Sequence, residues 1–157
     1  MDSTNLFSIP LVDLVFILSA LSFNLLIIGI YISNKLKKAE TVRRLGIAFL
    51  SLTIPFLLVF ISYLFSGKPM WIYLVFLAIF IYMFLEWLWD YRLKIDFRAD
   101  PKLHIPYIIL FYIVLAGNIA ITFTINRVWG WILSISFWLL LAALIFSLIP
   151  GRKPING

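Results

Sequence analysis

Five long apolar stretches cover most of this chain of 157 residues. Hydrophobic residues make up 64% of the chain and charged residues 13%, and the mean hydropathy is +1.07. A soluble domain of this size still exposes roughly a third of its unfolded surface, so it could not hide so many apolar side chains from water. A hydrocarbon core of about 30 Å is crossed by about 20 helical residues, whose backbone groups bond within the helix. The sequence therefore predicts an all-α integral membrane protein with five transmembrane helices and short loops.

We expect a single polytopic membrane domain that covers residues 1–157. The predicted transmembrane helices are 9–32, 45–65, 70–91, 103–124 and 128–149. Pro55 falls near the middle of the second helix, and it should kink this helix or loosen one backbone turn because proline lacks a backbone donor. Asp100 is typical of an N-cap and Pro101 of a first helical position, so we expect the fourth helix to start there.

Basic residues gather on one side of the predicted helices. The segments after the first and third helices, together with the C-terminal tail, hold eleven of them: Lys35, Lys37, Lys38, Arg43, Arg44, Arg92, Lys94, Arg98, Lys102, Arg152 and Lys153. The opposite side holds Lys68 and Arg127. Because cytoplasmic loops carry the excess of Lys and Arg, the N-terminus is expected outside and the C-terminus inside. The first apolar stretch has its basic residues after it, which predicts a retained helix and not a signal peptide.

The placement of charge also indicates partners and location. The net charge of +6 flanks the apolar stretches, where anionic lipids on the cytoplasmic face account for it, and nucleic-acid binding is not expected. The absence of cysteine excludes disulfides and thiolate chemistry within this sequence. No organelle-targeting element is recognisable, so we expect a multi-pass protein of the plasma membrane, with a prokaryotic source as the default.

Three ionisable residues near the cytoplasmic boundary form the first candidate site. Glu86 is expected just inside the boundary, and Asp90 follows at i+4, so both carboxylates should share one helix face. A shared proton or a bound cation would relieve their repulsion. His104 is expected in the first turn of the fourth helix, on the same side. Ionisable groups inside a membrane are candidates for function because they are costly. The alternative is a structural cluster of interfacial ion pairs with the basic residues that follow.

The motifs of common enzymes and metal sites are missing. The sequence has no glycine-rich phosphate loop, no Gly-x-Ser-x-Gly and no HExxH. Glu86, Asp90 and His104 are types of ligand that a divalent metal accepts. No repeated ligand spacing accompanies them, so no metal is predicted, and the sequence leaves the cofactor open.

Polar residues deeper in the predicted helices form the second candidate site. Asp13 and Asn24 are 11 residues apart, close to three helical turns, and should lie on one face of the first helix. Asn118 and Thr122 are one turn apart in the fourth helix. Such residues either line a pathway for an ion or polar solute or join helices through hydrogen bonds worth about 0.6 kcal/mol each. Both interpretations stay open.

Three functions fit these patterns. The favoured function is a non-catalytic subunit or scaffold of a membrane assembly, because it explains the short loops and the missing motifs. Its partners would be further copies of this chain or other membrane subunits. The alternative is a small oligomeric transporter or channel that uses Glu86 and Asp90 as a proton- or cation-linked site. A second alternative is an enzyme that acts on a lipid or isoprenoid at the cytoplasmic face, with His104 joining the two carboxylates as acid and base groups; the sequence favours catalysis less.

Overall fold

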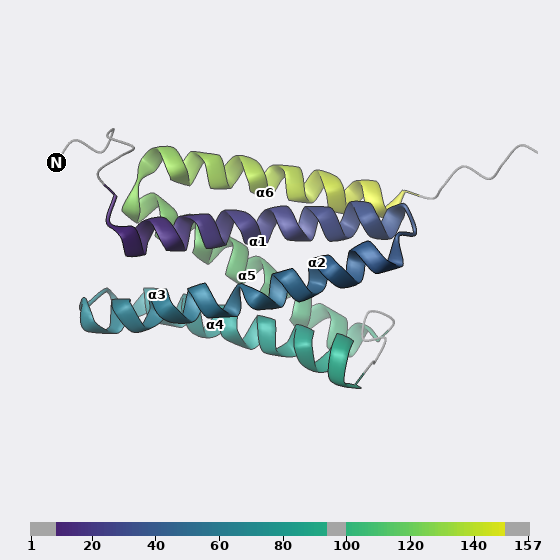
Figure 1. Cartoon of the computed structure of the whole chain (residues 1–157), viewed down its shortest axis with the longest axis horizontal. Coiled ribbons are helices and arrows are strands. Elements are labelled where there is room, and N and C mark those ends of the chain that lie inside the picture. The colour runs from purple at the N-terminus through teal and green to yellow at the C-terminus, as the bar shows by residue number, and fades with distance from the viewer. Residues whose placement is uncertain (1–8, 94–99, 150–157) are drawn as a thin grey trace, which may run out of the picture.

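The computed structural model describes residues 9–93 and 100–149, and all regular structure in these ranges is helical (Figure 1). The helices are α1 (Leu11–Lys35), α2 (Ala39–Ser51), α3 (Thr53–Phe65), α4 (Met70–Glu86), α5 (Pro101–Ile125) and α6 (Arg127–Leu148). A π-helical segment, η1 (Trp87–Leu93), continues α4.

Five membrane-crossing helices result from these elements. The candidate spans are Leu11–Lys35, Ala39–Phe65, Met70–Leu93, Pro101–Ile125 and Arg127–Leu148, each long and apolar enough to cross a bilayer. Large apolar side chains cover the outside of the bundle, as Ile135 and Trp138 of α6 show. By helix length and composition the chain is a small multi-pass membrane protein.

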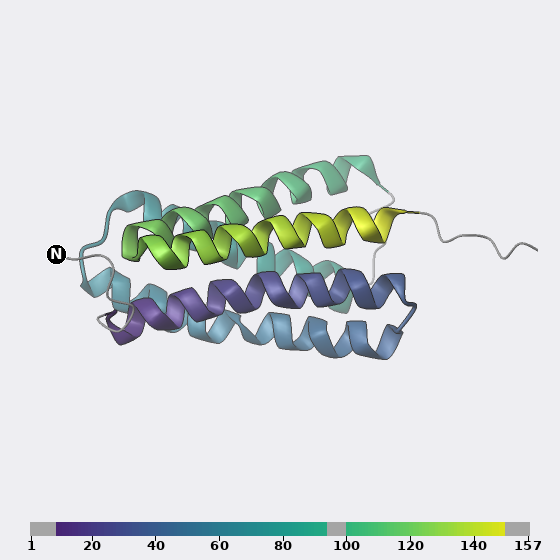
Figure 2. The ribbon, with the colours of Figure 1, turned by 90° about the horizontal axis from the view of Figure 1, so that it is seen from above.

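The bundle places α1 at its centre. This helix packs along α6 on one side and against α2 and α3 on the other, while α5 packs against both α4 and α6. Figure 2 shows α5 beside α6 and α1 beside α2. Buried rings fill the space between the layers: Phe16 of α1 lies 6.0 Å from Phe56 of α3 and 5.7 Å from Phe76 of α4, between ring centroids.

The second membrane-crossing helix is interrupted near Pro55, as the sequence predicts. The helix is interrupted at Leu52, between α2 and α3, three residues before Pro55. Proline has no N–H to donate to the carbonyl of Ser51, four residues earlier, so the regular ladder fails there. The helix also begins earlier than the expected residue 45: its first turns reach back to Ala39, and Glu40 and Arg44 pair at 2.9 Å across one turn.

Side-chain caps set the starts of α5 and α6. Asp100 accepts a hydrogen bond from the backbone N–H of Lys102 at 2.9 Å, and Pro101 is the first helical residue, which confirms the predicted start. Asn126 alone connects α5 to α6, and its side chain accepts hydrogen bonds from the N–H groups of Val128 and Trp129. This tight turn holds the two helices side by side.

Candidate functional site

A cavity of about 430 Å³ lies between α1, α2, α4, α5 and α6. It occupies the end of the bundle where α1 and α4 finish and α5 begins. Most of its wall is apolar, and its polar lining residues are Tyr31, Asn34, Tyr82, Glu86, His104, Tyr107, Tyr112 and Ser147. An apolar cavity with a few convergent polar groups is the usual form of a small-molecule site.

The most polar part of this cavity is a triangle of oxygen atoms from Glu86, Tyr82 and Tyr107. The Tyr82 hydroxyl donates to Glu86 Oε1 at 3.0 Å, and the Tyr107 hydroxyl donates to the same oxygen. The two hydroxyls lie 2.8 Å apart. Both tyrosines are buried and Glu86 is half-buried. Tyr82 and Glu86 share one face of α4 because they are one turn apart, and α5 brings Tyr107 to them.

The helix changes form directly after Glu86. Glu86 is the last residue of α4, and the π-helical turns of η1 follow it. Asp90 lies four residues further on, within η1. Of the two carboxylates only Glu86 lines the cavity, whereas Asp90 is exposed. In η1 the ring centroid of Trp89 lies 6.0 Å from that of Tyr107, so Trp89 packs against one residue of the triangle.

His104 reaches the same cavity from the first turns of α5. Its backbone N–H donates to the carbonyl of Asp100 at 2.9 Å, so the helix start fixes its position. Its Nδ1 is buried and has no hydrogen-bond partner in residues 9–93 and 100–149. Of the first candidate set, the structure thus brings Glu86 and His104 to one cavity. Among the described residues no three His, Asp or Glu side chains gather closely enough to hold a metal ion.

The mid-membrane amides lie in the packed interior and not on the cavity wall. Asn24 Nδ2 donates to Ser136 Oγ at 2.8 Å, and this bond joins α1 to α6. The Thr122 hydroxyl donates to the carbonyl of Asn118 one turn earlier, at 2.8 Å. Asn118 is buried, and within the described ranges its side-chain amide has no hydrogen-bond partner and does not meet Asn24.

Asp13 lies at the opposite end of the bundle. The Tyr63 hydroxyl donates to Asp13 Oδ1 at 2.6 Å, and Lys68 Nζ lies 3.9 Å from the same oxygen. Tyr73 donates its hydroxyl to the carbonyl of Tyr63 at 2.9 Å. These contacts tie the start of α1 to α3 and α4.

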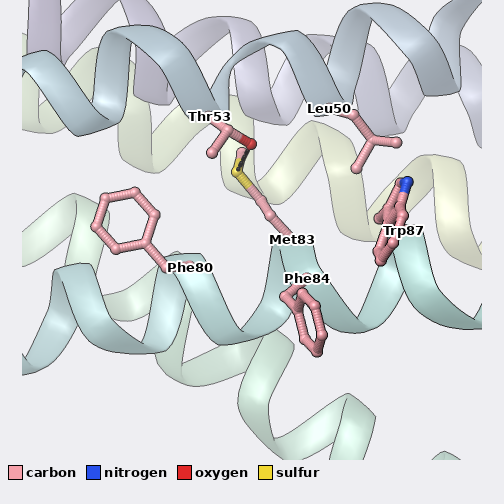
Figure 3. Close-up of a pocket in the computed structure, with 6 residues that line it drawn as sticks. All are labelled: Leu50, Thr53, Phe80, Met83, Phe84 and Trp87. Carbon is pink, nitrogen blue, oxygen red and sulfur yellow. Dashed lines mark hydrogen bonds between the residues drawn. The ribbon is translucent and has the colours of Figure 1, made fainter.

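A second, smaller pocket lies between α2, α3 and α4 (Figure 3). It measures about 270 Å³ and is lined by Leu50, Thr53, Phe80, Met83, Phe84 and Trp87. Its one hydroxyl is already engaged, since Thr53 donates to Met83 Sδ at 3.2 Å. Phe84 and Trp87 are exposed on the outside of the bundle, so this pocket is an apolar groove on the lipid-facing surface. It offers a ligand no ionisable group.

The sequence pattern did not indicate the tyrosines of the cavity. Tyr82 precedes Glu86 by four residues, a spacing that would have placed a hydroxyl beside the carboxylate. Tyr31 and Tyr107 come from other helices, and no local spacing relates them to Glu86.

The fold and its composition define the class: a small integral membrane protein with several membrane-crossing helices and a cavity at one end. No protein-family model, no curated protein and no solved structure matches this chain.

Proposed function

We propose that this protein is a small transporter that binds its substrate in the five-helix cavity, with Glu86 as a proton- or cation-linked group. The observation that carries the proposal is the position of Glu86: a half-buried carboxylate, within a membrane-crossing helix, on the wall of a cavity of about 430 Å³. Ionisable residues that face such cavities within a bundle mark substrate and ion pathways.

This proposal is preferred over a purely structural subunit or scaffold. A bundle that only packs needs hydrogen-bonded pairs between helices, and Asn24 with Ser136 and Asp13 with Tyr63 already supply them. The triangle also joins α4 to α5, but helix packing does not require a cavity of about 430 Å³ beside its carboxylate. An enzyme with three acid and base groups is favoured less, because Asp90 does not line the cavity.

We further propose that the cavity opens in the cytoplasmic half of the membrane. The turn between α1 and α2 carries Lys35, Lys37 and Lys38 at the cavity end, whereas the opposite end carries Lys68 and Arg127. By the positive-inside rule the N-terminus is then outside and the C-terminus inside. We place the protein in the plasma membrane, among anionic lipids, as a homo-oligomer. Of the five membrane-crossing helices, the one formed by α2 and α3 has the smallest share of buried residues, so we propose that a second copy packs there.

The orientation can be tested by labelling because the chain contains no cysteine. Single cysteines at Lys37 and Lys68 would be reacted with a membrane-impermeant maleimide in intact cells. We expect Lys68→Cys to react at once and Lys37→Cys to react only after the cells are permeabilised. The reverse pattern would contradict the proposed orientation.

The transport function is tested in proteoliposomes with three solutes that each contain one phenyl ring and differ in charge. Phenyl glucoside is neutral, benzylsulfonate is an anion and benzyltrimethylammonium is a cation. We expect uptake of at least one of them above that of protein-free vesicles, and loss of this uptake in Glu86→Gln. Glu40→Gln is the matched control, because it neutralises an exposed carboxylate on α2, and it should keep full uptake. If none of the three solutes is taken up, the structural-subunit hypothesis replaces transport.

A further inference from the structure

The charge of the cavity wall limits what the cavity can hold. Among the described residues its lining includes one carboxylate, Glu86, and no lysine or arginine. An anion would lie beside Glu86 in a low-dielectric site, with a protonated His104 as the one group among the described lining residues to offset its charge, which is costly. A cation would gain the carboxylate as its partner. The basic residues of the α1–α2 turn are not on the lining, and Lys35 instead contacts the carbonyl of Ile149 and the Phe146 ring.

Aromatic rings surround the same space. Phe49, Phe111 and Tyr112 line it together with Tyr31 and the two tyrosines of the triangle. The Tyr82 ring lies 5.2 Å from the Tyr107 ring and 5.5 Å from the Phe111 ring, between centroids, so three of the rings form one continuous wall. Aromatic faces attract organic cations, and quaternary ammonium groups are recognised by cages of this kind.

The number of hydrogen bonds within the triangle of Glu86, Tyr82 and Tyr107 depends on whether Glu86 is ionised or protonated. Three oxygen contacts join these residues, and the two hydroxyls bring two protons. With Glu86 ionised, at most two of the contacts are hydrogen bonds. With Glu86 protonated, the acid donates to Tyr107, Tyr107 donates to Tyr82 and Tyr82 donates back to Glu86, so all three contacts are hydrogen bonds. The triangle therefore has a place for one further proton.

We infer that the cavity takes an organic ammonium ion with an apolar body, and that this ion replaces one proton held by the triangle of Glu86, Tyr82 and Tyr107. The inference rests on the proposed function and names the substrate class of the same site. The exchange is balanced: the Glu86 carboxylic acid loses its O–H proton to solvent, and the ammonium ion becomes the counter-ion of the carboxylate. The net charge of the cavity is the same before and after, so the exchange adds no net charge to the membrane interior.

Few other groups can titrate beside Glu86. On α4 and α5 they are Tyr82, Tyr107, Tyr112 and His104. Tyr31 of α1 lines the cavity as well, and Tyr91 of η1 interacts electrostatically with Glu86. The lining residues of α2 and α6 include no titratable side chain in the described ranges, and Asp90 lies off the lining. His104 is thus the group whose protonation has to be separated from that of Glu86 by the experiment.

The test measures binding and proton release in the purified full-length chain. Benzyltrimethylammonium is added to the protein in weakly buffered detergent solution, with a pH indicator for protons and calorimetry for binding. At a pH below the range in which Glu86 ionises, we expect about one proton released per cation bound and a Kd that rises about tenfold for each further pH unit downward. Benzylsulfonate should not bind. These measurements use the unaltered chain, so they do not depend on whether a variant folds.

Two variants then show which residue releases the proton. Glu86→Gln should abolish proton release and weaken cation binding at least about tenfold. His104→Gln should keep proton release, because His104 is outside the triangle. Glu40→Gln is the matched control and should leave both readouts unchanged. Binding of the cation without proton release, a Kd that is independent of pH, or tighter binding of benzylsulfonate would each overturn the inference.

The results also separate this inference from the proposed function. If a neutral or anionic solute enters proteoliposomes in a Glu86-dependent way while the cation does not bind, transport stands and the substrate class is wrong. If the cation binds with proton release and no solute crosses the membrane, the substrate class stands and the protein is a binding protein without transport.

Discussion

The hydroxyl of Tyr82 lies 2.8 Å from the hydroxyl of Tyr107, 25 residues further along the chain. This contact joins α4 to α5 at the cavity, and both hydroxyls also contact the carboxylate of Glu86. Three polar groups thus contact one another on a mostly apolar cavity wall. Their arrangement holds the two helices together and presents the carboxylate to the cavity.

Removing either tyrosine hydroxyl should destabilise the protein. Tyr82→Phe and Tyr107→Phe each leave buried polar partners short of a hydrogen bond, and we expect each to lower the free energy of unfolding by about 1–3 kcal/mol. Because the two hydroxyls share one network, the double variant should cost at least about 0.5 kcal/mol less than the sum of the single changes. Reversible unfolding in mixed micelles measures these values. Tyr112→Phe, an exposed tyrosine of the same helix, is the control. Simple additivity would contradict a shared network.

The bond between Asn24 and Ser136 should hold α1 to α6. Ser136→Ala removes the acceptor at 2.8 Å and leaves the Asn24 amide buried without it, so we expect a loss of about 0.6 kcal/mol in the free energy of unfolding. A double-mutant cycle with Asn24→Ala should return a coupling energy of similar size. Ser134→Ala, whose hydroxyl donates to the carbonyl of Gly130 in its own helix, should show no coupling to Asn24. Equal coupling for both serines would argue against the interhelical bond.

Gly117 should be required for the close approach of α5 to α4. A Cβ at this position would lie 2.5 Å from Val75 Cγ1, too near for any real contact. Gly117→Ala is therefore expected to cost about 1–3 kcal/mol in the free energy of unfolding, since the packed interface has to shift. Adding Val75→Ala should restore part of that loss by opening the space. Ala116→Leu, on the exposed side of the same helix, should change stability little. A failure of Val75→Ala to rescue the variant would show that the cost arises elsewhere.

At the opposite end of the bundle, Tyr63→Phe should lower stability without affecting the cavity. The change removes a hydrogen bond of 2.6 Å to Asp13, with an expected cost of about 1–3 kcal/mol because the acceptor is a carboxylate. Lys68→Gln should cost no more than about 1 kcal/mol, because its ion pair with Asp13 is long and partly exposed. Unfolding in mixed micelles gives both values, and benzyltrimethylammonium binding reports on the cavity. Weakened cation binding in Tyr63→Phe would indicate that the two ends are coupled.

Local chemistry explains which parts of the fold were predictable. The break at Leu52 follows from the missing N–H of Pro55, and the start of α5 follows from Asp100 and Pro101. Both features depend on residues within one turn of each other. The π-helical form of η1 has no such local signature in the sequence. The sequence also did not show that Asp90, in this segment, is exposed and lies off the cavity lining.

The sequence by itself determined the class of the protein, because the length and apolarity of five stretches leave a membrane as the only solvent in which they can lie as helices. It also indicated Glu86, because a carboxylate stands out in an apolar helix. Only the tertiary structure decided what Glu86 contacts. Tyr107 and His104 come from α5 and Tyr31 from α1, and their distance from Glu86 depends on how whole helices pack. That packing is set by side chains far apart in the chain, such as Gly117 against Val75, and no local spacing records it.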